Sequence, residues 1–118
     1  MTIKRYNCNG RYHEAVEHNG VLYLSGQVGE NGGTIAQQAK DCLEGLKATL
    51  EKYGSDMEHV LSATVYLADM RAFKEFNSVW DAWFKEGTQP VRTCVEARLA
   101  GRQYDLEITL VAAVKEQG

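Results

Sequence analysis

The sequence predicts an α+β domain, in which two helices pack on one face of a mixed sheet of about six strands. Two segments place apolar residues at the three- and four-residue spacing of an amphipathic helix. Several shorter segments alternate apolar and polar residues, as half-buried strands do. With 118 residues, the chain is expected to form one domain over residues 1–118.

Three strands are predicted near the start of the chain. A short strand is expected at residues 3–6, and residues 14–18 and 21–25 flank Asn19 and Gly20. An Asn-Gly pair between two such segments is the strongest short-range signal for a β-hairpin with a type I′ turn. The second and third strands are therefore expected to be antiparallel neighbours.

Two helices follow, separated by a strand at residues 60–68. Thr34 suits the N-cap of the first helix, and Gly54 is placed to end it. Asp69 can cap the second helix, and Gly87 is placed to stop it. The residues expected on the buried faces are Ile35, Ala39, Cys42, Leu43, Leu46, Leu50 and Tyr53, then Phe73, Phe76, Trp80, Trp83 and Phe84. The aromatic stripe is interpreted as core rather than as a platform for nucleobases, because its spacing suits burial against a sheet.

The last two strands carry the polar groups. From Val91 onward the residues alternate, which places Arg92 and Cys94 on one face and an apolar row, including Val95, on the other. A turn is expected at residues 101–104, followed by a second strand with Glu107. We expect Arg92, Cys94 and Glu107 to lie on one strand pair and one face of the sheet. The strand at residues 60–68 is expected to turn Leu61 toward the opposite, apolar face.

The stretch from Gln89 to Ile108 resembles the signature of the Rid (YjgF) family of reactive intermediate deaminases. In that signature, Pro or Ala, a small residue, Arg and another small residue usually precede a Cys, and an aliphatic residue, Glu and Ile or Met close the stretch. Pro90, Arg92, Cys94 and Glu107 match it in type and spacing. The residue between the Arg and the Cys is Thr here, where Ser is commoner. The likeness extends over nearly the whole chain.

This resemblance implies a chorismate-mutase-like fold and a homotrimer with a cleft between each pair of subunits. It also implies that Arg92 grips a substrate carboxylate and that Glu107 positions an attacking water. Further residues match substrate-binding, cleft-lining positions of the family; they are Cys94, Tyr12, Ser25, Gly26 and Asn77. The family's loop often reads Gly-Pro-Tyr, then Ser or Val, then Gln, whereas residues 10–14 here read Gly-Arg-Tyr-His-Glu, so the preferred substrate stays open.

Each candidate has a structural alternative when it is considered from the residues alone. Arg92 can be a surface residue paired with Glu96 or Glu107, and Glu107 can be a solvated strand residue. A thiol beside Arg92 can have a lowered pKa and act as a nucleophile. Cys94 is nevertheless interpreted as a pocket wall, because imine hydrolysis requires no covalent step. Tyr12, Ser25 and Asn77 can be a packed loop residue, a strand end and an exposed helix residue.

The activity implied by the resemblance is hydrolysis of reactive 2-imino acids, formed from 2-aminoacrylate or related enamines, to 2-oxo acids and ammonia. No cofactor is expected. One alternative is a non-catalytic trimeric module that binds small carboxylates or partner proteins. A ribonuclease or translation inhibitor is the other alternative. The net charge of −3 and the lack of a basic run oppose nucleic-acid binding.

Composition sets further expectations. Three cysteines without a Cys-X-X-Cys pair favour reduced thiols in the cytoplasm. The three histidines lack the spacing of metal ligands, so no metal site is expected. The chain also shows no apolar signal segment and no run of eighteen apolar residues, so we expect neither secretion nor a membrane span.

Overall fold

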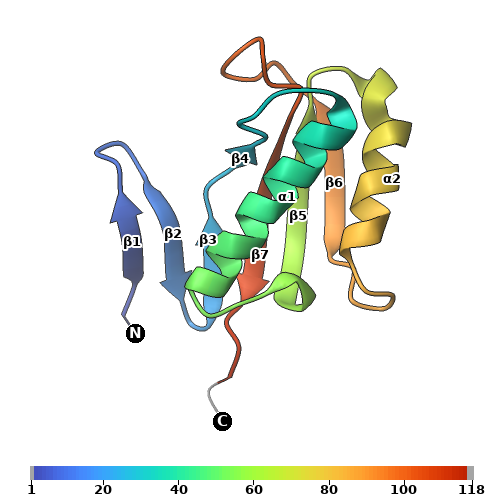
Figure 1. Cartoon of the computed structure of the whole chain (residues 1–118). Helices are drawn as coiled ribbons and strands as arrows, with labels where there is room; N and C mark the ends of the chain where they lie inside the picture. Colours follow the sequence, from blue (N-terminus) through green and yellow to red (C-terminus); the bar gives the residue numbers. More distant parts are fainter. Residues whose placement is uncertain (1, 117–118) are drawn as a thin grey trace.

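The computed structural model describes residues 2–116, which form one sheet with two helices on one of its faces (Figure 1). The strands are β1 (Lys4–Cys8), β2 (His13–His18), β3 (Val21–Leu24), β4 (Gln27–Val28), β5 (Val60–Leu67), β6 (Val91–Glu96) and β7 (Leu106–Ala113). The helices are α1 (Ile35–Lys52) and α2 (Phe73–Trp83), with short 3-10 turns at Met57–His59 and Met70–Ala72.

The strand order is β1-β2-β3-β7-β5-β6, and β4 pairs with β7 beside this path. β5 and β6 are parallel, whereas all the other pairs are antiparallel. The predicted α+β class, with a mixed sheet and two helices on one face, is therefore confirmed. The sheet has seven strands instead of about six, because two residues beyond the predicted third strand form β4.

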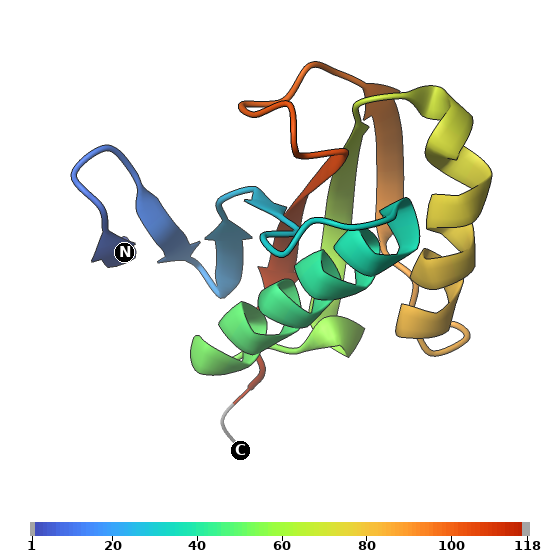
Figure 2. The ribbon, with the colours of Figure 1, turned by 45° about the horizontal axis from the view of Figure 1, so that its top comes forward.

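Both helices cover the same face of the sheet, as Figures 1 and 2 show from two directions. The core between these layers is apolar. It includes Leu43 and Leu46 of α1, Phe76 of α2, and Val65 and Ile108 of the central strands, all fully buried. Each such side chain contributes roughly 1.5 to 3 kcal/mol through burial. This layer fixes the sheet on which the candidate site lies.

Most local signals are confirmed. Asn19 and Gly20 both have positive φ, 53° and 78°, as a type I′ turn requires. Thr34 caps α1 through a capping box with Gln37, and Gly54 follows the end of the helix with φ 89°.

The limits of the second helix differ from the prediction. Asp69 caps the 3-10 turn that precedes α2, and α2 itself begins at Phe73. The helix ends at Trp83, where the next residue is already extended, so Gly87 does not stop it. The predicted position of Leu61 is also wrong. A register shift between Val60 and Ser62 marks a β-bulge, and Leu61 is left 48% exposed.

The predicted arrangement of the last two strands is wrong. β6 and β7 are not neighbours, because β5 lies between them. Across the three strands, Arg92 is aligned with Ala63 of β5 and Leu110 of β7. Glu107 is aligned with Tyr66 of β5 and Val95 of β6. Paired residues on neighbouring strands point to the same face. Arg92 and Glu107 therefore lie on opposite faces of the sheet.

Arg92 and Cys94 point to the face covered by the helices, and the apolar row that was expected in the core points away from it. On this uncovered face Val91 is 71% exposed, Tyr23 49% and Val95 40%. At the other end of the sheet, β1 and β2 stand out from the body of the molecule (Figure 2).

Candidate functional site

Four of the predicted site residues line one cavity of about 710 Å³. They are Tyr12, Ser25, Gly26 and Glu107, and they come from the β1–β2 loop, the segment between β3 and β4, and β7. The volume is within the usual range of small-molecule sites, roughly 300 to 1,000 Å³. We call this group the carboxylate half-site.

Tyr12 is presented at the mouth of this cavity by an ordered turn. The Asn9 side-chain oxygen accepts hydrogen bonds from the backbone N–H of Arg11 at 2.9 Å and of Tyr12 at 3.0 Å. The Asn9 N–H in turn donates to the Tyr12 carbonyl at 3.0 Å. Because the backbone is fixed while the side chain is 56% exposed, the ring is available to a ligand.

Ser25 holds the loop in place, and the next residue, Gly26, leaves room for the Glu107 carboxylate. Its hydroxyl donates to the His13 carbonyl at 2.7 Å, and its backbone N–H donates to the Glu14 carbonyl at 3.0 Å. The hydroxyl proton is thus already used, and only acceptor capacity remains for a ligand. Gly26 has no side chain, which allows the Glu107 carboxylate to lie against its backbone.

The Glu107 carboxylate is half-buried and unpaired. Among residues 2–116, no side chain or backbone group makes a hydrogen bond or ion pair with it. A carboxylate in this position has its acceptor capacity free for a water molecule or a ligand.

The other three predicted residues form a second group, which we call the guanidinium half-site. Arg92 Nη1 donates to Asn77 Oδ1 at 2.8 Å. The guanidinium carbon lies 5.1 Å from the ring centroid of Trp80 and 5.6 Å from that of Phe73. These aromatic faces stabilise the cation on the helix side of an edge strand.

Arg92 makes no ion pair with any residue in the described part of the chain, so the alternative of a pairing with Glu96 or Glu107 is not observed there. Only one of its five N–H groups has a side-chain partner there. The remaining donors have the planar geometry that binds a carboxylate through two bonds.

Cys94 lies two residues from Arg92 on the same face. Burial raises the pKa of its thiol, and the charge of Arg92 only partly opposes this effect. The thiol is therefore protonated at neutral pH, which disfavours the nucleophile alternative.

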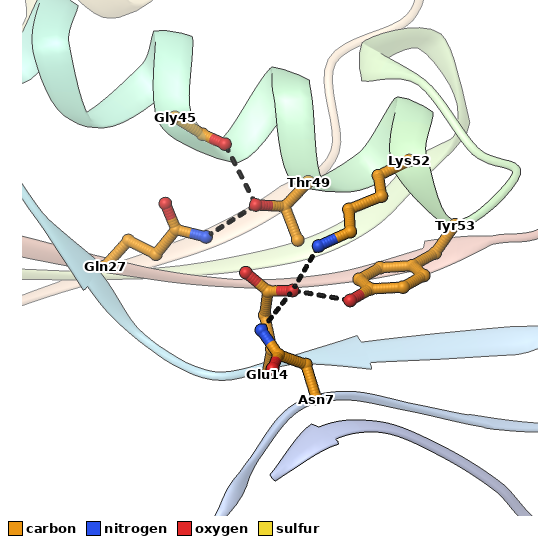
Figure 3. Close-up of polar contacts among 7 residues, drawn as sticks. All are labelled: Asn7, Glu14, Gln27, Gly45, Thr49, Lys52 and Tyr53. Atoms are coloured by element: carbon orange, nitrogen blue, oxygen red, sulfur yellow. Dashed lines mark hydrogen bonds and ion pairs between the residues drawn. The ribbon is translucent and has the colours of Figure 1, made fainter. Parts of the chain in front are cut away.

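The structure thus separates the predicted residues into two half-sites on opposite faces of one chain. It also shows groups that the sequence did not indicate. Glu14 lines the carboxylate half-site and is held by Tyr53 and Lys52, which come from the end of α1 (Figure 3). The sequence gives one signal for Glu14, its difference from the Gln that is usual at this position of the family's loop. It gives no signal for the contact with Tyr53 and Lys52, because β2 and α1 are far apart along the chain. Trp80 belongs to the predicted aromatic stripe of the second helix, but the sequence does not predict its contact with Arg92.

The carboxylate half-site is acidic. Glu14, Glu30 and Glu107 line the cavity, and no Lys or Arg does so within residues 2–116. This cavity alone would repel an organic anion, so a cation from another source is needed to bind one.

Sequence and structure comparisons agree on one family. The profile described as Endoribonuclease L-PSP matches residues 2–114. The RutC family protein YoaB of Escherichia coli is 40% identical over 114 residues, which cover 97% of this chain and 100% of the relative. This chain belongs to the YjgF/RutC family. The Rid resemblance, which concerned the same family, is confirmed.

Solved structures of the YjgF/RutC family share this fold closely. NMB1025 from Neisseria meningitidis, described as a member of the YjgF protein family, has a TM-score of 0.96 and is 45% identical; 99% of this chain and 98% of that chain are covered. Yeast Mmf1 has a TM-score of 0.89 at 28% identity, with 97% and 100% covered. The match therefore extends over both half-sites.

Residues 2–116 of this YjgF/RutC protein contain neither a metal-binding cluster nor a membrane-spanning helix. Within residues 2–116, no group of three or more His, Cys, Asp or Glu side chains is placed to hold a metal ion. No helix in the same range is long and apolar enough to cross a membrane.

Proposed function

We propose that this protein hydrolyses reactive 2-imino acids to 2-oxo acids and ammonia. The observation that carries the proposal joins two groups that have no charged partner among residues 2–116. They are the Glu107 carboxylate in a ligand-sized cavity and the Arg92 guanidinium, which Asn77 holds in place. A small carboxylate with an electrophilic carbon requires these two groups, one as an anion clamp and the other as a base near water.

The two half-sites can act together only if they come from different subunits, because one chain turns them to opposite faces. In keeping with the family resemblance, we propose a homotrimer in which each cleft combines the guanidinium half-site of one subunit with the carboxylate half-site of the next. The exposed Val91, Val95 and Tyr23 on the uncovered face support association, since such apolar side chains gain from burial between copies.

In the proposed reaction, the substrate carboxylate binds Arg92. Glu107 accepts a proton from water as the water oxygen bonds to the imine carbon, and it passes this proton to the imine nitrogen. The hydroxyl proton of the resulting carbinolamine then moves to the nitrogen, the C–N bond breaks to release ammonia, and the hydroxyl oxygen becomes the carbonyl oxygen of the 2-oxo acid. Cys94 and Tyr12 form walls of the cleft, and no cofactor takes part. Positioning and charge stabilisation suffice, because free imines already hydrolyse in water.

Two alternatives are less well supported. The family description names an endoribonuclease, but the acidic cavity and the net charge of −3 oppose binding of a polyanion. A module that only binds carboxylates would need the Arg92 clamp but not an unpaired carboxylate beside it.

The experiment generates 2-iminopropanoate with a serine or threonine dehydratase and follows its loss with semicarbazide as a trap. We expect the purified protein to accelerate this loss and Arg92→Ala to reduce kcat/KM roughly 100-fold, as loss of a two-bond contact to a charge predicts. Arg71→Ala is the matched control, because the Arg71 side chain is exposed and, among the described residues, bonds only to Asp69. Equal rates for wild type and Arg92→Ala would rule the proposal out.

A further inference from the structure

The carboxylate half-site contains more negative charge than the proposed reaction uses. The reaction needs Glu107 alone, yet Glu14 and the exposed Glu30 line the same cavity. Glu14 is also one of three positions, with Arg11 and His13, at which this chain departs from the loop pattern described above. A charged residue in a ligand cavity that takes no part in the chemistry is a candidate for recognition of the substrate's side chain.

Glu14 is fixed through only one of its oxygens. Oε1 accepts hydrogen bonds from the Tyr53 hydroxyl at 2.5 Å, and from Lys52 Nζ and Asn7 Nδ2 at 3.4 Å each (Figure 3). Oε2 accepts none from residues 2–116. The carboxylate is thus oriented by the protein and retains a free oxygen.

The charge of Glu14 persists at neutral pH. The hydrogen bond from Tyr53 lowers the pKa of the carboxyl group, and bonds from Asn7 and Lys52 act in the same direction. Lys52 does not line the cavity, and its side chain is 57% exposed. It approaches the oxygen that Tyr53 already binds and leaves the other oxygen free.

The wall beside Glu14 also offers a free acceptor. Gln27 Nε2 donates to Thr49 Oγ1 at 3.0 Å, and Thr49 Oγ1 donates to the Gly45 carbonyl at 3.0 Å (Figure 3). These bonds use the Thr49 hydroxyl proton and one of the two N–H groups of the Gln27 amide, whereas Gln27 Oε1 accepts no hydrogen bond from the described residues. A ligand group with several N–H donors and a positive charge matches this wall.

We propose that Glu14 is a specificity-determining residue that favours 2-imino acids whose side chain ends in a cation, such as a guanidinium group. This inference rests on the proposed function and adds a substrate class to it. The substrate carboxylate lies on Arg92 of one subunit, the imine carbon lies beside Glu107 of the next, and the side chain extends along that subunit's cavity to Glu14 and Gln27.

The test compares two imines of nearly equal size and shape. An L-amino-acid oxidase generates them from arginine, which carries a guanidinium, and from citrulline, which carries a neutral urea group. We expect kcat/KM for the arginine imine to exceed that for the citrulline imine roughly tenfold, the size of one charge-assisted hydrogen bond. Glu14→Gln keeps an oxygen for Tyr53 but removes the charge, and it should bring this ratio close to one.

Glu86→Gln is the matched control, because Glu86 is exposed and does not line the cavity. It should leave the ratio unchanged. If Glu14→Gln does not fold, a wild-type ratio near one still overturns the inference. A ratio near one with activity on 2-iminopropanoate, or a ratio unaffected by Glu14→Gln, overturns this inference and leaves the proposed function standing. Inactivity on all three imines overturns both.

Discussion

Gly26 lies so close to Glu107 that a β-carbon on Gly26 would collide with Glu107 Oε2 and come within 3.1 Å of Thr109 Oγ1. The colliding atom is the end of a flexible side chain, so Gly26→Ala should displace the carboxylate and preserve the fold. We expect kcat/KM for 2-iminopropanoate to fall at least about tenfold, because small displacements of a reacting group are costly. Thermal unfolding should change little.

A double mutant tests this reason. If Gly26→Ala acts through Glu107, it should have no further effect on the rate in a Glu107→Gln background. Additive losses would show that Gly26 contributes in another way, for example through its own backbone.

The division of the site between subunits leads to a complementation experiment. Arg92→Ala and Glu107→Gln should each be inactive alone. When the two variants are dissociated and reassembled in equal amounts, about a quarter of the clefts in a ring should combine an intact Arg92 with an intact Glu107. Activity measured after mixing should rise accordingly. No gain after verified exchange of subunits would contradict the shared site.

The sequence predicted the layers of the fold but not the way in which the strands are combined. Helical and alternating periods are local properties, so α1, the hairpin at Asn19 and Gly20, and the mixed sheet followed from them. Strand order depends on contacts between distant segments. The insertion of β5 between β6 and β7, which separates Arg92 from Glu107, left no local signal.

Alternation also does not say which face of a strand is covered. It grouped Arg92 correctly with Cys94, but the opposite row, with Val95, Ala97 and Leu99, suggested that the other face was the core. In the structure Arg92 lies on the helix side because Asn77 and the Trp80 ring accommodate its charge there. A family signature gives positions along the chain and no positions in space. The resemblance therefore named the residues of both half-sites as one set.

Asn77 orients the Arg92 guanidinium through the hydrogen bond to Nη1, so its substitution should affect substrate binding. Asn77→Ala removes the bond, and we expect KM for 2-iminopropanoate to rise several-fold as Arg92 becomes less ordered. Asn77→Asp should raise KM further, because its carboxylate would pair with Arg92 and compete with the substrate. The comparison requires steady-state kinetics of both variants. A lower KM for Asn77→Asp than for Asn77→Ala would contradict a substrate-binding Arg92.

The three cysteines should differ in reactivity. Burial raises the pKa of Cys42 to about 12 and also raises that of Cys94, whereas Cys8 is exposed. Iodoacetamide at pH 8 should therefore alkylate Cys8 first, which peptide mass spectrometry can measure. Cys94→Ala should keep most of the imine-hydrolysing activity, since no covalent step uses the thiol. Rapid alkylation of Cys94 with parallel loss of activity would restore the nucleophile alternative.

The bond between Tyr53 and Glu14 connects α1 to β2 and should make stability depend on pH. Tyr53→Phe keeps the ring that stacks on Tyr6 with a centroid distance of 4.5 Å, but it removes the hydroxyl that lowers the pKa of Glu14. A carboxyl group whose pKa is lowered by folding stabilises the protein above its unfolded pKa, about 4.3, and this contribution disappears as the pH falls through the lower folded pKa. Urea midpoints should therefore be lower for Tyr53→Phe than for wild type at pH 7, and the difference should shrink as the pH is reduced below about 4.3.

Tyr23→Phe is the control, because Tyr23 is exposed and its hydroxyl makes no hydrogen bond within residues 2–116. Its effect on the urea midpoint should be small both at pH 7 and below pH about 4.3. A difference between Tyr53→Phe and wild type that stays constant down to pH 3 would mean that Tyr53 stabilises the hairpin by packing and not through the ionised Glu14.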